Sequence, residues 1–320
     1  MPQRALITGV AGQDGTYLTE LLLGKGYEVY GVPGPAPGAF LEWAARHEDR
    51  LFPIHADLTD MESLLEAVAV SRPDEVYNFA AQSSVGDSFA SAIATTEVNA
   101  VGVLRILEAI RQIAPDARFF QAASAEMFGN AAEMPQRETT PLQPRSPYAA
   151  SKTYAFHIVG SYRDSYAMHA SNGIMFNHES PLRGMQFVTR KITDGAARIK
   201  LGLADELHLG NLDAKRDWGF AGDYVEAMWM MLQHDTPDDY VIATGEVHTV
   251  REFCSAAFGC LGLDYERYVK VDPRFFRPVD VNTLFGDPTK VRTILGWEPR
   301  VHFEQLVEMM VRADMERLSR

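Results

Sequence analysis

The chain has 320 residues, 46% of them hydrophobic and 23% charged, a balance typical of a soluble globular protein of one large or two modest domains. Its formal net charge of −13 argues against a polyanionic partner, so we expect neither nucleic acid nor a membrane surface as a partner. No membrane-length apolar run or secretory signal pattern is present, and the two cysteines lack metal or redox spacing. We therefore expect a cytoplasmic protein without a bound metal.

The first predicted element is a short buried strand at residues 5–8, and helical apolar spacing follows it from Tyr17. Between them lie Gly9, Gly12 and Gly15, in the pattern G-x-x-G-x-x-G. The first glycine would allow a tight turn, the second a close approach of pyrophosphate to the backbone, and the third close packing of the helix on the strand. The free N–H groups at the helix start would face the phosphates. The stretch therefore predicts dinucleotide binding.

Strands and helices alternate through the next part of the chain. We predict strands at 27–32, 51–56, 75–80 and 118–123, a loop at 33–38, and helices at 61–70 and 99–113. Such alternation requires right-handed crossovers, so the fold class is α/β with a doubly wound parallel sheet.

From Ile174 onward the alternation loosens. Residues 177–190 are polar and irregular, and the predicted elements that follow are helices at 191–200 and 223–233 and strands at 206–210 and 240–244. We expect a dinucleotide-binding domain at 1–173, to which about 212–244 returns. A smaller α/β substrate domain would comprise 174–211 and 245–320.

Tyr148 and Lys152 are four residues apart, which places both side chains on one face of a helix. An ammonium group near a phenol favours the phenolate, so we expect Lys152 to lower the pKa of Tyr148 from about 10 towards neutrality. A phenolate beside a nicotinamide is a suitable base for the oxidation of an alcohol. The Y-x-x-x-K pattern also occurs by chance in many helices, and its weight here comes from the glycine-rich opening of the same chain.

The two motifs together resemble the extended short-chain dehydrogenase/reductase superfamily, whose members modify nucleotide sugars. Further phrases resemble the GDP-mannose 4,6-dehydratase family over nearly the whole length: residues 12–18 (GQDGTYL), 176–181 (FNHESP), 188–192 (VTRKI), 216–219 (RDWG), 271–278 (VDPRFFRP), 286–290 (GDPTK) and 295–297 (LGW). The resemblance implies a Rossmann-type fold and an internal redox cycle on GDP-mannose. Hydride would leave sugar C4 and return to C6 with loss of water, giving GDP-4-keto-6-deoxy-mannose.

The resemblance also implies the roles of the catalytic residues. Tyr148 with Lys152 would remove the O4 proton, Glu126 matches the family's C5 base, and Ser124 matches the hydroxyl residue that faces O4. Position 125 is a departure, because the family has a serine or an aspartate there and this chain has Ala125. If that group helps to protonate the leaving C6 hydroxyl, Glu126 or a water must do so alone.

Cofactor and substrate contacts are implied at further positions. The cofactor contacts are Gly9, Gly12, Gln13, Asp14, Gly15, Asp57, Leu58, Ala80, Ala81, Ser83, Tyr148, Lys152, Asn177 and His178. The substrate contacts are Ser84, Asn177, Glu179, Val188, Lys191, Arg216 and Arg277, with Arg183 nearby and Leu182 where the family often has a second arginine. His178 lacks a partner at metal-ligand spacing, so we interpret it as a loop histidine.

The loop after the second strand is the other departure. In the family this loop carries an arginine that neutralises the 2′-phosphate of NADP, and it helps to join subunits into a tetramer. Residues 33–38 contain no arginine, and the strand does not end in the acidic residue typical of NAD sites. The resemblance implies NADP, and NAD stays possible. The shortened loop predicts a homo-oligomer that is a dimer rather than a tetramer.

Two kinds of alternative remain open. A related nucleotide-sugar 4-epimerase or 4-keto reductase would use the same scaffold without a C5 base, and a dehydratase could act on another nucleotide sugar. Alternatively, the chain could be a catalytically weak nucleotide-binding regulator, a reading motivated by Ala125 and the missing arginine.

Overall fold

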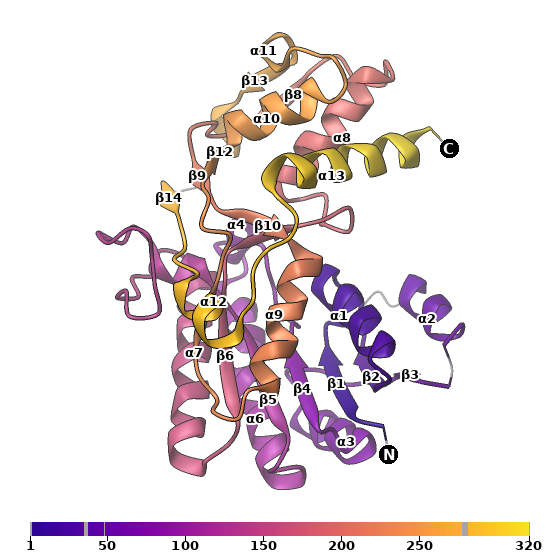
Figure 1. The fold of residues 1–320 in the computed structure, drawn as a ribbon, viewed down its shortest axis with the longest axis vertical. Coiled ribbons are helices and arrows are strands. Elements are labelled where there is room, and N and C mark those ends of the chain that lie inside the picture. The colour runs from indigo at the N-terminus through magenta and orange to yellow at the C-terminus, as the bar shows by residue number, and fades with distance from the viewer. Residues whose placement is uncertain (1, 35–37, 48, 277–280, 320) are drawn as a thin grey trace.

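A computed structural model describes residues 2–34, 38–47, 49–276 and 281–319. Its centre is a seven-stranded, wholly parallel sheet in the order β3-β2-β1-β4-β5-β6-β11 (Figure 1). The strands are β1 (Arg4–Thr8), β2 (Glu28–Val32), β3 (Leu51–Pro53), β4 (Glu75–Asn78), β5 (Arg118–Ser124), β6 (Ala170–Met175) and β11 (Tyr240–Ile242). The predicted doubly wound α/β sheet is confirmed.

Helices cover both faces of the sheet. Neighbouring strand residues point to opposite faces, so apolar residues on both faces need to be buried. Ala5 and Ile7 of β1 pack in one apolar cluster with α1 and α9, whereas Leu6 packs in the other with α3, α6 and α7. These helices are α1 (Gln13–Gly24), α9 (Ala221–Gln233), α3 (Met61–Ser71), α6 (Gly102–Ile113) and α7 (Pro147–Tyr166). Residues 212–244, which we expected to return to the first domain, include α9, which packs on the sheet, and β11, which is one of its strands.

A smaller part of the chain lies above the carboxyl ends of the strands (Figure 1). This part has its own apolar core, in addition to the two beside the sheet. That core is formed mainly by α8 (Val188–Lys200), α10 (Val250–Gly259) and α13 (Phe303–Leu318). Short strands pair beside it: β7 (Asn177–Glu179) with β10 (Trp218–Phe220), β8 (Leu207–Leu209) with β13 (Val269–Val271), and β9 (Lys215–Arg216) with β12 (His248–Thr249) and β14 (Thr283–Leu284). The domain boundaries proposed from the sequence stay a prediction.

The remaining elements are short. They are α2 (Gly38–Ala44), α4 (Val85–Ser88), α5 (Ala92–Thr96), α11 (Tyr265–Tyr268), α12 (Thr289–Leu295), a π-helical turn (Glu97–Val101) and 3₁₀ turns at Ala125–Phe128 and Pro273–Phe275. None of the described helices combines the length and apolar character that a membrane crossing requires.

Three local expectations need correction. α1 begins at Gln13, directly after Gly12, instead of near Tyr17, so Gly15 lies inside its first turn. The polar stretch after β6 contains β7, whose Asn177–Glu179 strand pairs with β10. α8 begins at Val188, three residues before the predicted start. In each case the element contains polar residues whose partners lie elsewhere in the chain. The spacing of apolar residues does not reveal such partners.

Candidate active site

The glycine-rich turn has the backbone that its pattern predicts. Gly9 adopts φ +70°, and a Cβ there would lie 2.9 Å from the Ala80 backbone nitrogen. A Cβ on Gly15 would lie 2.5 Å from the Gly9 carbonyl oxygen and from Val10 Cα, so the helix can approach the turn only with glycine there. In this described turn no side chain caps the start of α1, whose Ncap is Gly12. The first N–H groups of α1 therefore remain available to an anion.

A cavity of about 950 Å³ opens over this turn, at the upper end of the range for small-molecule sites. Most of the predicted cofactor residues line it: Gly9, Gly12, Gln13, Asp14, Gly15, Asp57, Leu58, Ala80, Ala81 and Ser83. Arg183, noted in the sequence only as a neighbour, also lines the cavity and is the sole lysine or arginine among the described lining residues. Uncapped amides, close-packed glycines and this cation fit a dinucleotide.

The predicted catalytic residues meet at the carboxyl end of β5. Ser124 ends that strand and caps the following 3₁₀ turn, where its Oγ accepts a 3.3 Å hydrogen bond from the Glu126 N–H. Ser146 caps α7 and Pro147 occupies its first turn, which brings Tyr148 beside Ser124. The Glu126 carboxylate lies near enough to act electrostatically on the Tyr148 phenol.

The expected lowering of the Tyr148 pKa is wrong. Burial of the phenol raises its pKa to about 12, against the smaller lowering effects of a Ser124 hydrogen bond and the Arg183 charge. Lys152 Nζ lies 5.9 Å from the Tyr148 ring centroid and donates a 2.8 Å hydrogen bond to the Ala122 carbonyl. Burial lowers the pKa of the Lys152 ammonium to about 8. Desolvation therefore dominates both groups.

His178 is not the loop histidine that we expected. It lies in β7, is 9% exposed, and stacks on Tyr224 with ring centroids 4.9 Å apart. Its Nε2 lies 2.9 Å from Asp14 Oδ2, and its Nδ1 lies 2.8 Å from the Phe176 carbonyl oxygen. Because both ring nitrogens face acceptors, the doubly protonated imidazolium fits this position. The pair joins the start of α1 to β7.

The two pKa values shift in opposite directions. Burial alone would raise the pKa of Asp14, but the His178 charge and hydrogen bonds outweigh it, and the net shift is downward. Burial alone would lower the pKa of His178, but Asp14 outweighs it, and the net shift is upward. The charged pair is thus the stable form.

Glu179 and Arg183 form a second pair beside the cavity. Glu179 is 1% exposed, accepts a 2.6 Å hydrogen bond from Thr189 Oγ1, and lies 3.0 Å from Arg183 Nε. The Arg183 guanidinium carbon lies 3.6 Å from the Phe187 ring centroid. Glu179 therefore orients Arg183, and it is not among the residues that line the cavity.

Among the described residues, the other predicted substrate residues do not line this cavity, and neither do Tyr148, Lys152 and His178. Ser84 caps α4, Asn177 opens β7, Val188 opens α8, and Arg216 is a buried residue of β9. Lys191, in the first turn of α8, has its Nζ 5.4 Å from the Phe275 ring centroid. Arg277 lies outside the described residues. Within the described ranges, no cluster of three or more His, Cys, Asp or Glu side chains could hold a metal ion.

Known proteins resemble the chain over almost all of its length. The family model described as GDP-mannose 4,6 dehydratase matches residues 6–310. GDP-mannose 4,6 dehydratase 2 of Arabidopsis thaliana is 54% identical over 99% of this chain and 88% of that relative. The human GDP-mannose 4,6 dehydratase is 46% identical over 98% of this chain and 91% of its own length.

Solved structures show the same architecture. The UDP-glucose 4-epimerase of Thermus thermophilus in complex with NAD has a TM-score of 0.82 at 28% identity, over 98% of this chain and 99% of that one. Shared architecture alone does not separate epimerases from dehydratases. The family model and the sequence identities do, and the chain belongs to the GDP-mannose 4,6-dehydratase family.

Proposed function

We propose that this chain is a nucleotide-sugar 4,6-dehydratase that converts GDP-mannose into GDP-4-keto-6-deoxy-mannose. One observation carries the proposal beyond the family assignment. Ser124, Glu126 and Tyr148 interact with one another at the carboxyl end of β5, beside a cavity that fits a dinucleotide. A 4-epimerase or 4-keto reductase needs no C5 base at this point, whereas removal of a C5 proton requires a base, which the Glu126 carboxylate can provide.

Each residue has a distinct part in the proposed reaction. Tyr148 takes the proton of the sugar O4 hydroxyl, and Ser124, its hydrogen-bond partner, positions the phenol. A nicotinamide bound in the cavity would supply the acceptor for the C4 hydride and the donor for its return to C6. The resulting C4 ketone acidifies the neighbouring C5 proton, and the Glu126 carboxylate takes it. Loss of the C6 hydroxyl as water completes the elimination, and C5 regains a proton when hydride enters C6, which balances the O4 proton that Tyr148 removed.

Because position 125 is alanine, we propose that Glu126 serves as both the acid and the base of the turn Ala125–Phe128. The Ala125 side chain is 2% exposed and packs in an apolar cluster with Met127 and Phe128. It therefore supplies no proton to the leaving C6 hydroxyl. We propose that Glu126, protonated once it has taken the C5 proton, delivers that proton to the leaving group.

The cofactor is proposed to be NADP, with weak discrimination against NAD. Near the end of β2 the cavity is lined by Val32, Pro33, Gly34 and Leu41, none of which carries a charge. An arginine fork is the usual partner of a ribose 2′-phosphate, and without one the extra phosphate adds little affinity. We expect the dissociation constants of NADPH and NADH to lie within about tenfold of each other. Fluorescence titration measures both, and a difference of about a hundredfold or more would contradict this part.

For the diphosphate of the substrate we propose Arg216 and Arg277, with Val188 and Lys191 towards the nucleoside. Asn177 and Ser84 are proposed to contact the sugar. The start of α8 at Val188 adds a helix N-terminus, which favours an anion. Substitution of Arg216 by glutamine should weaken binding of GDP itself, which calorimetry measures without turnover.

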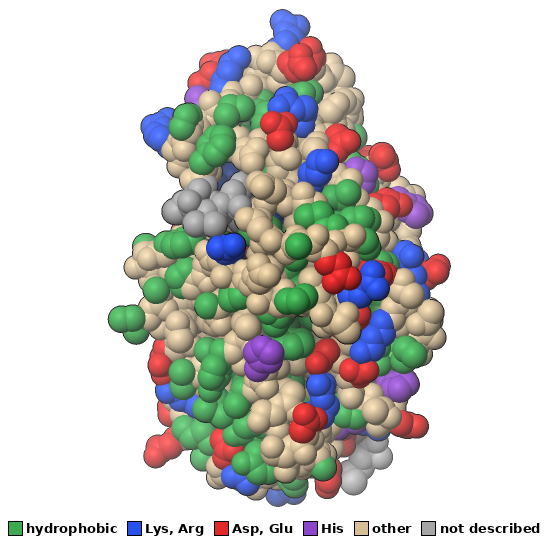
Figure 2. All heavy atoms as spheres, turned by 90° about the vertical axis from the view of Figure 1, so that its left-hand side faces the viewer, with side chains coloured by type: hydrophobic (Ala, Val, Ile, Leu, Met, Phe, Trp, Pro, Cys, Tyr) green, Lys and Arg blue, Asp and Glu red, His purple; other side chains and the backbone are tan. Residues whose placement is uncertain are grey.

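We also propose a homodimer. Hydrophobic side chains are spread over the sheet-bearing half of the face that holds α7 (Figure 2). α5 packs on α7, and Ile93 of α5 is 87% exposed while Tyr154 of α7 is 43% exposed. Light scattering should give twice the chain mass, and four times that mass would contradict the proposal.

The substrate proposal is tested by incubating the purified chain with GDP-mannose or UDP-glucose, each with NADP or NAD. Mass spectrometry should show loss of one water from GDP-mannose and none from UDP-glucose. A product of unchanged mass but altered sugar configuration would favour an epimerase. Binding of GDP-mannose without any reaction would favour the nucleotide-binding regulator.

A further inference from the structure

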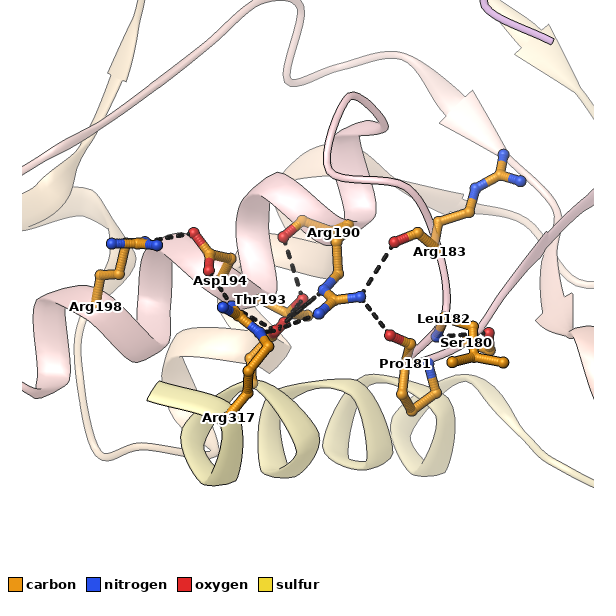
Figure 3. A network of polar contacts seen from close by, with 10 residues as sticks. Ser180, Pro181, Leu182, Arg183, Arg190, Thr193, Asp194, Arg198 and Arg317 are labelled. Carbon is orange, nitrogen blue, oxygen red and sulfur yellow. Dashed lines mark hydrogen bonds and ion pairs between the residues drawn. The ribbon is translucent and has the colours of Figure 1, made fainter. Parts of the chain in front are cut away.

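A buried ion pair connects the last helix of the chain to the loop beside the cavity. Arg190 lies in the first turn of α8, and Asp314 lies in the last turns of α13, the helix packed against it. The side chain of Arg190 is 9% exposed and that of Asp314 is fully buried. Figure 3 shows Arg190 between α13 and the loop that carries Ser180 to Arg183.

The guanidinium of Arg190 divides its donors between Asp314 and two backbone carbonyls of the loop. Nε donates to both Asp314 oxygens at 3.1 and 3.0 Å, and Nη2 donates to Oδ1 at 2.7 Å. Nη1 donates to the Pro181 carbonyl and, at 3.1 Å, to the Arg183 carbonyl. Because the guanidinium fork is planar and rigid, the loop carbonyls are fixed relative to the Asp314 carboxylate.

Asp314 is in turn held in place by Thr193 of α8 and Arg317 of α13. Thr193 Oγ1 donates to its Oδ2 at 2.7 Å, and Arg317 Nη2 donates to its Oδ1 at 3.0 Å. Arg317 also pairs with Asp194, which accepts a 2.7 Å hydrogen bond from Arg198. The network therefore has a core at Arg190 and Asp314 and a periphery at Arg317 and Arg198.

The loop held by Arg190 contributes directly to the cavity. Leu182, Arg183 and Gly184 all line it. Figure 3 shows the Arg183 side chain directed away from the network while its backbone faces Arg190. The Arg183 charge acts on both Asp14 and Tyr148, so its position affects the start of α1 and the catalytic phenol together.

We infer that Arg190 and Asp314 are positioning residues that hold the 180–184 loop so that Arg183 faces the cofactor. This inference rests on the proposed function, because it assigns the cavity to a nicotinamide dinucleotide. The alternative is a purely structural pair that holds α13 on α8. The two differ in one respect: a positioning pair acts through Arg183, whereas a structural pair does not.

A double-mutant cycle with NADPH as the probe separates the two. Arg190→Lys keeps the charge, but one ammonium cannot span Asp314 and both carbonyls. We expect this variant to bind NADPH about tenfold or more weakly by fluorescence titration while its fold is retained by circular dichroism. In the Arg183→Gln background the same substitution should change binding less than about twofold. Arg198→Gln, which removes a partly exposed cation of the same helix that pairs with Asp194, is the matched control and should bind as the parent does.

Equal effects of Arg190→Lys in both backgrounds would overturn the inference, as would unchanged binding in the folded Arg190→Lys chain. If that variant does not fold, Asp314→Asn, which keeps the shape of the carboxylate, replaces it in the same cycle. An unsubstituted chain that binds neither NADPH nor NADH would instead refute the cofactor proposal.

Discussion

Asp14, in the first turn of α1, and His178, in β7, form a partly buried ion pair of 2.9 Å, and Asp14 lines the cofactor cavity. They are 164 residues apart in the chain. The pair joins the glycine-rich turn, which belongs to the sheet layer, to β7, which pairs with β10 outside that sheet. It therefore connects two parts of the chain that contribute to the site. Its charge state consequently links the stability of the fold to pH.

The first prediction concerns that linkage. Because the folded pKa of His178 is raised, its stabilisation is complete below its ordinary pKa of 6.5 and is lost as pH rises through the folded value. Because the folded pKa of Asp14 is lowered, its stabilisation is present above 3.8 and is lost as pH falls through the folded value. The difference in melting temperature between the parent and His178→Gln should therefore be largest at about pH 5 to 6 and shrink at higher pH. A difference that grows from there to about pH 9 would contradict the ion pair.

The second prediction concerns Glu126. Its replacement by glutamine keeps the size of the side chain but removes the proposed C5 base, so release of water should slow by about 100- to 10,000-fold. Binding of GDP-mannose, measured by calorimetry, should change little. Glu316→Gln, an exposed carboxylate of α13, is the control and should keep the parental rate. Full activity of Glu126→Gln would favour an epimerase or a reductase.

The third prediction concerns glycine in α1. Gly15→Ala should abolish NADPH binding or folding, since the new Cβ would lie 2.5 Å from backbone atoms of the turn. Gly24 is the last residue of the same helix, and a Cβ there meets nothing within 4 Å. Gly24→Ala should therefore raise the free energy of unfolding by about 0.5–1 kcal/mol and leave binding unchanged. Chemical denaturation and fluorescence titration measure the two quantities. Equal binding by both variants would show that the turn does not approach a ligand.

The fourth prediction is the pH profile of kcat/KM. The active combination is a Tyr148 phenolate with a Lys152 ammonium, whose pKa values are about 12 and about 8. Its population rises with pH up to about 8 and then levels off, because each further gain in phenolate is matched by a loss of ammonium. Initial rates across this range check the expectation. A continued rise well above pH 8 would show that the charge of Lys152 is not required.

Much of the sheet could be predicted from the sequence because buried parallel strands such as β1 and β5 contain short apolar runs, Ala5 to Ile7 in β1 and Phe119 to Phe120 in β5. β7 was missed because its three residues, Asn177–Glu179, are all polar. His178 and Glu179 are buried with polar partners, Asp14, Thr189 and Arg183, that come from elsewhere in the chain. Local periodicity carries no record of such partners.

In the candidate site too, local spacing predicts some features, and contacts between distant residues determine the others. Spacing placed Tyr148 and Lys152 on one face of α7, but the direction of the Tyr148 pKa depends on burial, which the whole fold determines. The proposed role of Arg190 in holding the 180–184 loop depends on Asp314, which is 124 residues away. The short motif around Arg190 could not reveal that role. Arg183 was noticed beside the substrate loop, and the structure adds that it lines the cavity.

In the proposed reaction one hydride leaves C4 of the sugar and returns to C6 within a single active site. The most direct test uses GDP-mannose carrying deuterium at C4, incubated with the purified chain and unlabelled cofactor. We predict loss of one water and deuterium at C6 of the product, by mass spectrometry and proton NMR. A product that has lost water but carries no deuterium at C6, or a sugar nucleotide that loses no water at all, would contradict the account.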